Sequence, residues 1–144
     1  MRIQREGMPV VKTDLVNGER QLGRYMGVIL RQHDGDWVPV VRHLDTIVTN
    51  YRLMLRPLQK RYTPASIPSS YFQQVQMQQR GPHDCLLLHL TTGQVLVFMV
   101  STGRLADLYD DLNAMRAKPT RIHFDERVVR ADVERLIGFL DSPV

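Results

Sequence analysis

The stretch TIVTNYRLMLRP, residues 46 to 57, decides between two folds. Its apolar residues recur at helical spacing, but a helix here would hold Pro57 in its interior. The proline ring removes an amide donor and clashes with the previous turn, at a cost of about 3 kcal/mol. The four consecutive residues 46 to 49 are also all β-branched, which favours a strand. We therefore predict two strands, residues 44 to 49 and 52 to 56, joined by a tight turn.

The composition is typical of one folded domain. The chain has 144 residues, of which 43% are hydrophobic, so it is too apolar for a disordered chain and long enough for its own core. No apolar run approaches the roughly 18 residues of a membrane-spanning helix, and residues 1 to 10 lack the apolar centre of a secretory signal. Cys85 is the only cysteine, which excludes an internal disulfide. We expect a reducing, cytoplasmic location, or a peripheral one at a membrane.

Turn signals divide the first two thirds of the chain into hairpins. Asn-Gly at 17 to 18, HDGD at 33 to 36 and TTG at 91 to 93 each separate two segments of strand length. The predicted hairpins pair residues 10–16 with 21–30, 27–32 with 37–44, and 85–90 with 94–100. Residues 70 to 79 alternate between apolar residues and glutamines, which indicates a half-buried strand with Tyr71, Val75 and Met77 facing the core.

The last third of the chain predicts two helices. Ser101 or Thr102 would cap the first, which Pro119 ends, and Asp125 would cap the second. The apolar stripes of the two helices are Leu105, Leu108, Tyr109, Leu112 and Met115, then Val129, Val133, Leu136, Ile137 and Leu140. The acidic residues of the first helix, Asp107, Asp110 and Asp111, are expected on its solvated side. Residues 120 to 124 suggest a short strand, and no linker divides the chain, so residues 1 to 144 form one domain.

Several segments, in this order, resemble the pattern of GRAM and related pleckstrin-homology-like domains. They are GERQL at 18–22, TIVTNYRLML at 46–55, SIPSSYFQQV at 66–75, LLLHLTTGQVLVF at 86–98 and GRLADLYDDL at 103–112. The resemblance implies an α+β fold over residues 18 to 115, in which one helix closes a bent antiparallel sheet or seven-stranded barrel. A strand and a helix at about 120 to 142 extend it.

Lipid-binding relatives carry basic residues in the loop after the first strand. Here that loop is RQHDGDW, with one arginine and two aspartates, so no inositol phosphate site is carried over.

The remaining candidate site is a basic set, Arg52, Arg56, Lys60 and Arg61. Arg52 and Arg56 fall on one face of a strand because their separation is even. The set would hold acidic lipid headgroups or an acidic peptide through charge-assisted contacts, unless it is an ordinary solvated surface. Trp37 either anchors a partner or folds over the edge of the core.

Metal and catalytic sites have weaker support. His83, Cys85 and His89 are close in sequence, as are His33, Asp34 and Asp36, but a structural zinc site needs four ligands and the second set suits a tight turn anyway. Cys85 lies in an apolar run, where burial raises the pKa of a thiol and leaves it unreactive. No phosphate-binding glycine loop, nucleophile elbow or pair of catalytic carboxylates occurs. We therefore predict no cofactor and no enzymatic activity.

These observations favour a non-catalytic binding module that recognises a protein partner or an anionic membrane surface. The alternative is a small basic nucleic-acid-binding protein, because the formal net charge is +4. Aromatic residues make up only 7% of the chain, and no strand offers a stacking platform for bases. The second helix is not needed to close the sheet, so its apolar stripe predicts a homodimer through residues 126 to 140.

Overall fold

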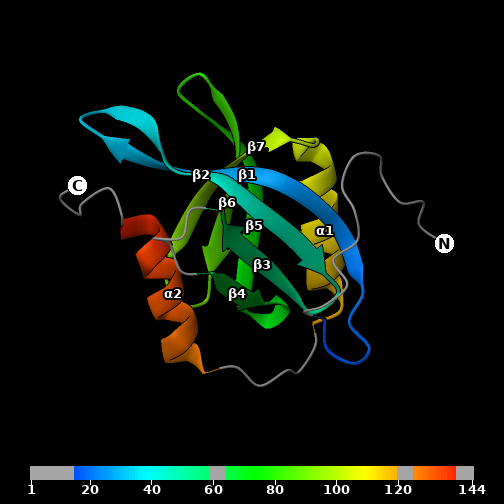
Figure 1. Ribbon diagram of the computed structural model, residues 1–144. Coiled ribbons are helices and arrows are strands. Elements are labelled where there is room, and N and C mark those ends of the chain that lie inside the picture. The colour runs from blue at the N-terminus through cyan, green and yellow to red at the C-terminus, as the bar shows by residue number, and fades with distance from the viewer. Residues whose placement is uncertain (1–14, 59–63, 120–124, 139–144) are drawn as a thin grey trace.

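The computed structural model describes residues 15–58, 64–119 and 125–138, and within these ranges the chain forms an α+β fold of one sheet and two helices (Figure 1). In chain order the elements are β1 (Gln21–His33), β2 (Asp36–Thr49), β3 (Arg52–Pro57), β4 (Ala65–Pro68), the 3₁₀ turn η1 (Ser69–Tyr71), β5 (Phe72–Arg80), β6 (His83–Leu90), β7 (Val95–Thr102), α1 (Leu105–Ala117) and α2 (Glu126–Gly138). The predicted class is confirmed.

Residues 46 to 57 lie in two strands and the turn between them, as predicted. β2 and β3 pair antiparallel, with Ile47 opposite Met54 and Val48 opposite Leu53. The hydroxyl oxygen of Thr49 accepts hydrogen bonds from the amides of Tyr51 and Arg52, each at 3.0 Å. The Thr49 side chain thus supplies a hydrogen-bond acceptor for two backbone amides of the tight turn between β2 and β3. These bonds stabilise the turn.

The strands form one antiparallel sheet in the order β4-β3-β2-β1-β7-β6-β5. β4 and β5 end the sheet, so within the described residues it is bent and open and not a closed barrel. The hairpins predicted at HDGD and TTG are β1-β2 and β6-β7. Asp34 and Gly35 have φ of 51° and 84° at the first of these turns, which suits the twist of the strands. Of the strand predicted at 10–16, residues 10–14 lie outside the described ranges, and Leu15 and Val16 are not in a strand.

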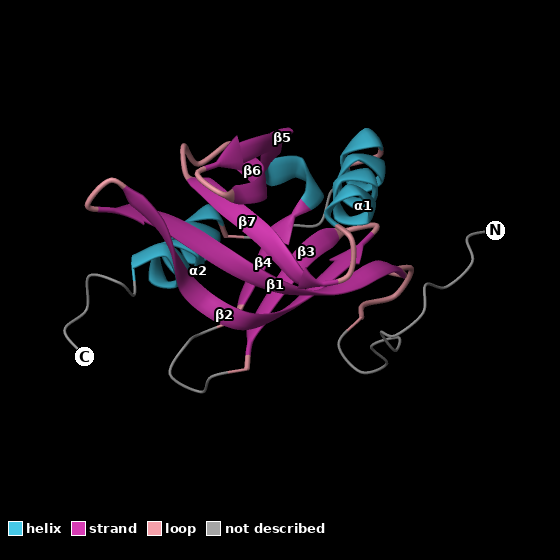
Figure 2. Ribbon diagram, turned by 90° about the horizontal axis from the view of Figure 1, so that it is seen from above, coloured by secondary structure: helices cyan, strands magenta, loops and turns pink. Residues whose placement is uncertain are grey.

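The bent sheet and both helices share one main core. α1 packs beside β5, β6, β1 and β2, and α2 packs on β4, β2 and β1, at the opposite end of the molecule in both views (Figures 1 and 2). The buried apolar residues of the helices belong to the predicted stripes, and they are Leu108, Leu112 and Met115 from α1 with Val129, Val133 and Leu136 from α2. The side chain of Ile137 and all of Leu140 lie outside the described residues, as does the strand predicted at 120–124.

Two predictions about α1 are wrong. Neither Ser101 nor Thr102 caps it, because β7 continues through Thr102 and the helix begins only after Arg104. Asp111 is not on the solvated side, since none of it is exposed and the hydroxyl of Tyr25 donates a hydrogen bond to its carboxylate. Asp111 follows Leu108 by three residues and so shares its face, and the tyrosine supplies the partner that burial requires.

α2 begins as predicted, with the Asp125 carboxylate accepting a hydrogen bond from the amide of Arg127 at 2.9 Å. This bond holds the pKa of Asp125 below its ordinary value. The described part of its apolar stripe is buried against the chain's own sheet. The described part of the apolar surface that led us to predict a homodimer through residues 126 to 140 is thus covered within one copy, and that dimer stays a prediction.

Candidate functional site

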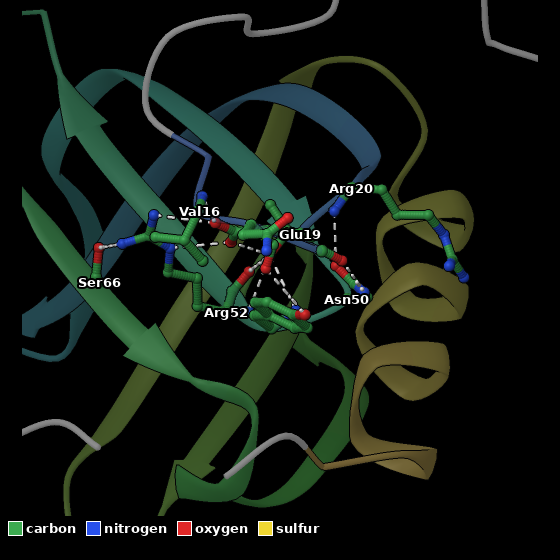
Figure 3. A network of polar contacts seen from close by, with 10 residues as sticks. Val16, Glu19, Arg20, Asn50, Arg52 and Ser66 are labelled. Carbon is green, nitrogen blue, oxygen red and sulfur yellow. Dashed lines mark hydrogen bonds and ion pairs between the residues drawn. The ribbon is translucent and has the colours of Figure 1, made fainter. Parts of the chain in front are cut away.

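Arg52, the first residue of the predicted basic set, is part of an internal ion pair. Its guanidinium lies 3.0 Å (Nε to Oε2) and 3.1 Å (Nη2 to Oε1) from the carboxylate of Glu19. The Glu19 side chain is fully buried and that of Arg52 is 14% exposed. Figure 3 shows the pair between the segment that precedes β1 and the start of β3. Arg52 thus joins two segments of the chain.

Further donors surround the Glu19 carboxylate. The Thr49 hydroxyl donates to it at 2.6 Å and the Val16 amide at 3.0 Å. Burial by itself would raise the pKa of Glu19, but the hydrogen bonds from Arg52, Thr49 and Val16, with the charge of Arg52, outweigh that effect and lower the pKa. We call Glu19, Thr49 and Arg52, together with Asn50, the Glu19 cluster.

Asn50 completes the Glu19 cluster. Its side-chain oxygen accepts a hydrogen bond from the Arg20 amide at 2.8 Å, and its side-chain nitrogen donates to the Gly18 carbonyl at 3.2 Å (Figure 3). Two of the segments that carry the family resemblance, GERQL and TIVTNYRLML, therefore meet here. Sequence reasoning missed Glu19 as the partner of Arg52, although both residues belong to those quoted segments.

The rest of the predicted basic set does not form a cation cluster within the described residues. Arg56 is half-buried on β3 and lies across from Asp45 of β2 in the sheet register. Asp45 also accepts two hydrogen bonds from the guanidinium of Arg24, at 2.8 and 2.9 Å. Lys60 and Arg61 lie outside the described residues. Arg52 and Arg56, the two described arginines of the set, are thus each near a carboxylate. The negative charge of that carboxylate reduces the attraction of the arginine for other anions.

Trp37 folds over the edge of a second, smaller apolar cluster, one of the two alternatives given by the sequence. The cluster consists of Val28, Leu30, Cys85, Leu87 and Val97, with Met99 beside it. The guanidinium carbon of Arg80 lies 5.6 Å from the centre of the Trp37 ring, within the range of a cation–π contact. Because Trp37 follows the β1-β2 turn and Arg80 precedes the β5-β6 turn, this contact joins the tips of two hairpins (Figure 1).

The candidate metal residues have other contacts. His89 shares a hydrogen bond of 3.0 Å with the side chain of Gln76, and His33 lies 3.4 Å from Asp34 at an exposed turn. In the part of the chain that the structure describes, no three His, Cys, Asp or Glu residues are grouped to hold a metal ion. Burial raises the pKa of Cys85, as expected for a thiol in an apolar run.

The outer edge of β5 is one of the two unpaired edges of the described sheet. β5 pairs with β6 from Phe72 to Arg80, and none of the described strands pairs with its other side. The exposed residues of this strand are Gln73, Gln74, Met77, Gln78 and Gln79. An uncovered edge presents backbone amides and carbonyls that are free to pair with another strand.

A hollow of about 340 Å³ lies beside this edge. It is lined by Met77, Gln78, Gln79, Asp84, Cys85 and Leu105, which come from β5, β6 and the start of α1. Met77 was predicted to face the core but is 50% exposed, because the core does not extend into this hollow. At the other end of α1, Arg116 donates a hydrogen bond of 2.9 Å to the Gln73 carbonyl. α1 therefore runs alongside β5 from the hollow to this bond (Figure 1).

Comparison with models of known protein families and with curated proteins finds no match to this sequence. Among the described helices, none has the length and apolar character needed to cross a membrane. The geometry of the site is therefore the basis for a functional proposal.

Proposed function

We propose that this chain is a non-catalytic, pleckstrin-homology-like binding module that recognises a protein partner by accepting an extended segment along β5. The observation that carries the proposal is the unpaired edge of β5 among the described strands, with the hollow of about 340 Å³ beside it. The order of the strands and the packing of α1 on the sheet support the pleckstrin-homology-like part of the proposal. We name this surface, residues 74 to 79 with Leu105, the β5 edge.

Strand addition explains how such a surface gains both affinity and selectivity. The backbone groups of an extended segment pair with those of the edge strand, whatever the side chains are. Alternate side chains of the added strand point to one face, so one of them would enter the hollow next to Met77 and Leu105. A methionine suits that role because its flexible, polarizable side chain adapts to different apolar partners.

A protein partner accounts for the described surface better than an anionic membrane or a nucleic acid. Arg52 and Arg24 are each bonded to a carboxylate, which offsets their charge. Trp37 packs on the chain's own apolar cluster and is not presented as a base-stacking platform. No charged side chain interrupts β5 between Phe72 and Gln79, so the edge carries no electrostatic preference for anions.

The proposal is tested by selecting binders from a displayed library of random peptides. Met77→Glu places a charge at the hollow and should lower peptide capture about tenfold or more, as expected for a central interface residue. Val128→Glu is the matched control, because Val128 is 56% exposed on α2 and lies away from β5. Bound peptide should also slow amide hydrogen exchange in residues 74 to 80.

Equal capture by Met77→Glu and Val128→Glu would show that peptides bind elsewhere. If the wild-type protein captures no peptide and instead sediments with anionic vesicles at physiological salt, the membrane alternative replaces the protein partner.

A further inference from the structure

We propose that the β5 edge binds β5 of a second copy of this chain, antiparallel, about a two-fold axis that passes through Gln76. This inference rests on the proposed function, since it names the segment that the edge accepts. The resulting homodimer would join the sheets of the two copies into one. It differs from a dimer through α2, whose described stripe is buried within one copy.

The sequence of β5 is symmetric in chemical type about Gln76. Residues 73 to 79 read QQVQMQQ, which is the same class of residue in either direction. In an antiparallel pair centred on Gln76, residues equally far from the centre face each other. The facing pairs are then Gln73 with Gln79, Gln74 with Gln78, Val75 with Met77, and Gln76 with itself.

Each of these pairs is favourable. A glutamine side chain has both donors and an acceptor, so two facing glutamines satisfy each other without any other residue. Stacked glutamine ladders stabilise strand pairs for this reason. Val75 and Met77 are both apolar and would face each other across the axis; Met77 is half-exposed and lines the hollow, whereas Val75 is buried in the main core. A two-fold interface pairs residue i of one copy with residue j of the other and j with i, and the pairing about Gln76 has this form.

The sequence of the edge lacks the features that keep other sheet edges apart. Natural edge strands are often protected by charged side chains, prolines, bulges or short length. β5 spans nine residues, with no proline and no charge before Arg80. Its only irregularity in the pairing with β6 lies between Phe72 and Gln74, so residues 74 to 80 form a regular ladder. β4, at the other end of the sheet, has only four residues.

The structure also limits the length of the contact. Arg116 already occupies the Gln73 carbonyl, so the ladder between the two copies would comprise residues 74 to 78. A ladder this short buries less surface than the roughly 800 Å² per partner of a stable interface. We therefore expect a weak dimer whose fraction rises with protein concentration.

Sedimentation velocity over a range of concentrations tests the dimer. The wild-type protein should approach twice the 16.7 kDa mass of one chain. In Q74K/Q78K, lysine faces lysine twice across the axis, and this variant should stay monomeric. In Q74K/Q78E, lysine faces glutamate twice, and dimerisation should return. Gln74 and Gln78 are both exposed, so unchanged melting curves are expected to show that the variants fold.

A wild-type protein that stays monomeric at every concentration would overturn the inference. Dimerisation of Q74K/Q78K like that of the wild type, or monomeric Q74K/Q78E, would overturn the proposed register. Peptide capture separates the two proposals. A monomeric wild type that captures displayed peptides at Met77 keeps the binding module and removes the dimer. A dimer that responds to charge as predicted, but captures no displayed peptide, keeps the dimer and removes the wider recognition of protein partners.

Discussion

Glu19 is a carboxylate in a place that water does not reach, and its surroundings replace the lost hydration. Burying a charge is costly unless it is paired and hydrogen-bonded. Here Arg52 provides the opposite charge, while Thr49 and the Val16 amide provide further donors. Because these groups come from three separate segments, the single charge of Glu19 holds the start of β1 and the β2-β3 turn together.

The lowered pKa of Glu19 predicts a pH-dependent stability. The carboxyl has a lower pKa in the folded than in the unfolded chain, where it is about 4.3. Its stabilisation is therefore complete above that unfolded value and is lost as the pH falls through the folded pKa. Glu19→Gln should cost about 2 kcal/mol at pH 7, because Arg52 loses its charged partner.

Urea unfolding of the wild type and Glu19→Gln between neutral and strongly acidic pH checks this prediction. The difference in the free energy of unfolding should shrink below about pH 4. A difference that stays constant over the whole range would mean that the charge of Glu19 does not contribute to stability.

Single residues also mark where sequence reasoning fails. The sequence predicts Arg52 as part of a basic set that binds anions. A pattern along the chain does not show whether its guanidinium faces solvent or a buried carboxylate. Asp111 was assigned to the solvated side of α1 because aspartate is usually exposed. Its burial depends on Tyr25, which is 86 residues away in sequence, and no local signal reports that pairing.

At the level of elements, the packing of β1 against β7 depends on a missing side chain. A methyl group added at Gly27 would overlap the ring of Phe98 and would lie 2.8 Å from the hydroxyl of Thr46. Phe98 is almost fully buried in the main core, so it has little room to move. The glycine therefore lets a large aromatic residue of β7 pack directly on the backbone of β1.

Gly27→Ala should lower the free energy of unfolding by about 1–3 kcal/mol, the usual cost of overpacking a core. In a Phe98→Leu background, the same substitution should cost clearly less, because the ring that it displaces is gone. A double-mutant cycle measured by urea unfolding gives the coupling between the two positions. Additive effects would show that another neighbour, such as Thr46, is responsible.

The sequence predicted most elements because their signals are local. The turns HDGD and TTG have their own chemistry, and the stripes of α1 and α2 follow the helical period. The exposure of Met77 was not predictable in that way. The alternation of apolar and polar residues shows which face of β5 a side chain occupies. Whether Met77 is exposed on that face depends on the position of its neighbours, such as the start of α1. The β5 edge was missed as a candidate site because the order of the strands is a tertiary property.

For the whole molecule, the net charge of +4 is the argument for a nucleic-acid partner, and the predicted basic set is the argument for an anionic membrane. The described structure reduces both arguments, since Arg52 and Arg24 are bonded to Glu19 and Asp45. What remains is a diffuse positive charge, which attracts anions over a range that salt shortens. That range is about 30 Å at 0.01 M salt and about 8 Å at physiological strength.

We therefore expect the protein to sediment with anionic vesicles at low salt, not with neutral vesicles, and to lose that binding at physiological salt. Arg56→Glu should change the low-salt binding no more than Arg42→Glu, an equal change of charge at an exposed residue of β2. The pair Lys60→Glu and Arg61→Glu tests the other half of the predicted basic set in the same assay. Binding that survives physiological salt and is lost only when Arg56, or only when Lys60 and Arg61, are reversed would identify a defined headgroup site. That result would place the function of the chain at a membrane surface and not at the β5 edge.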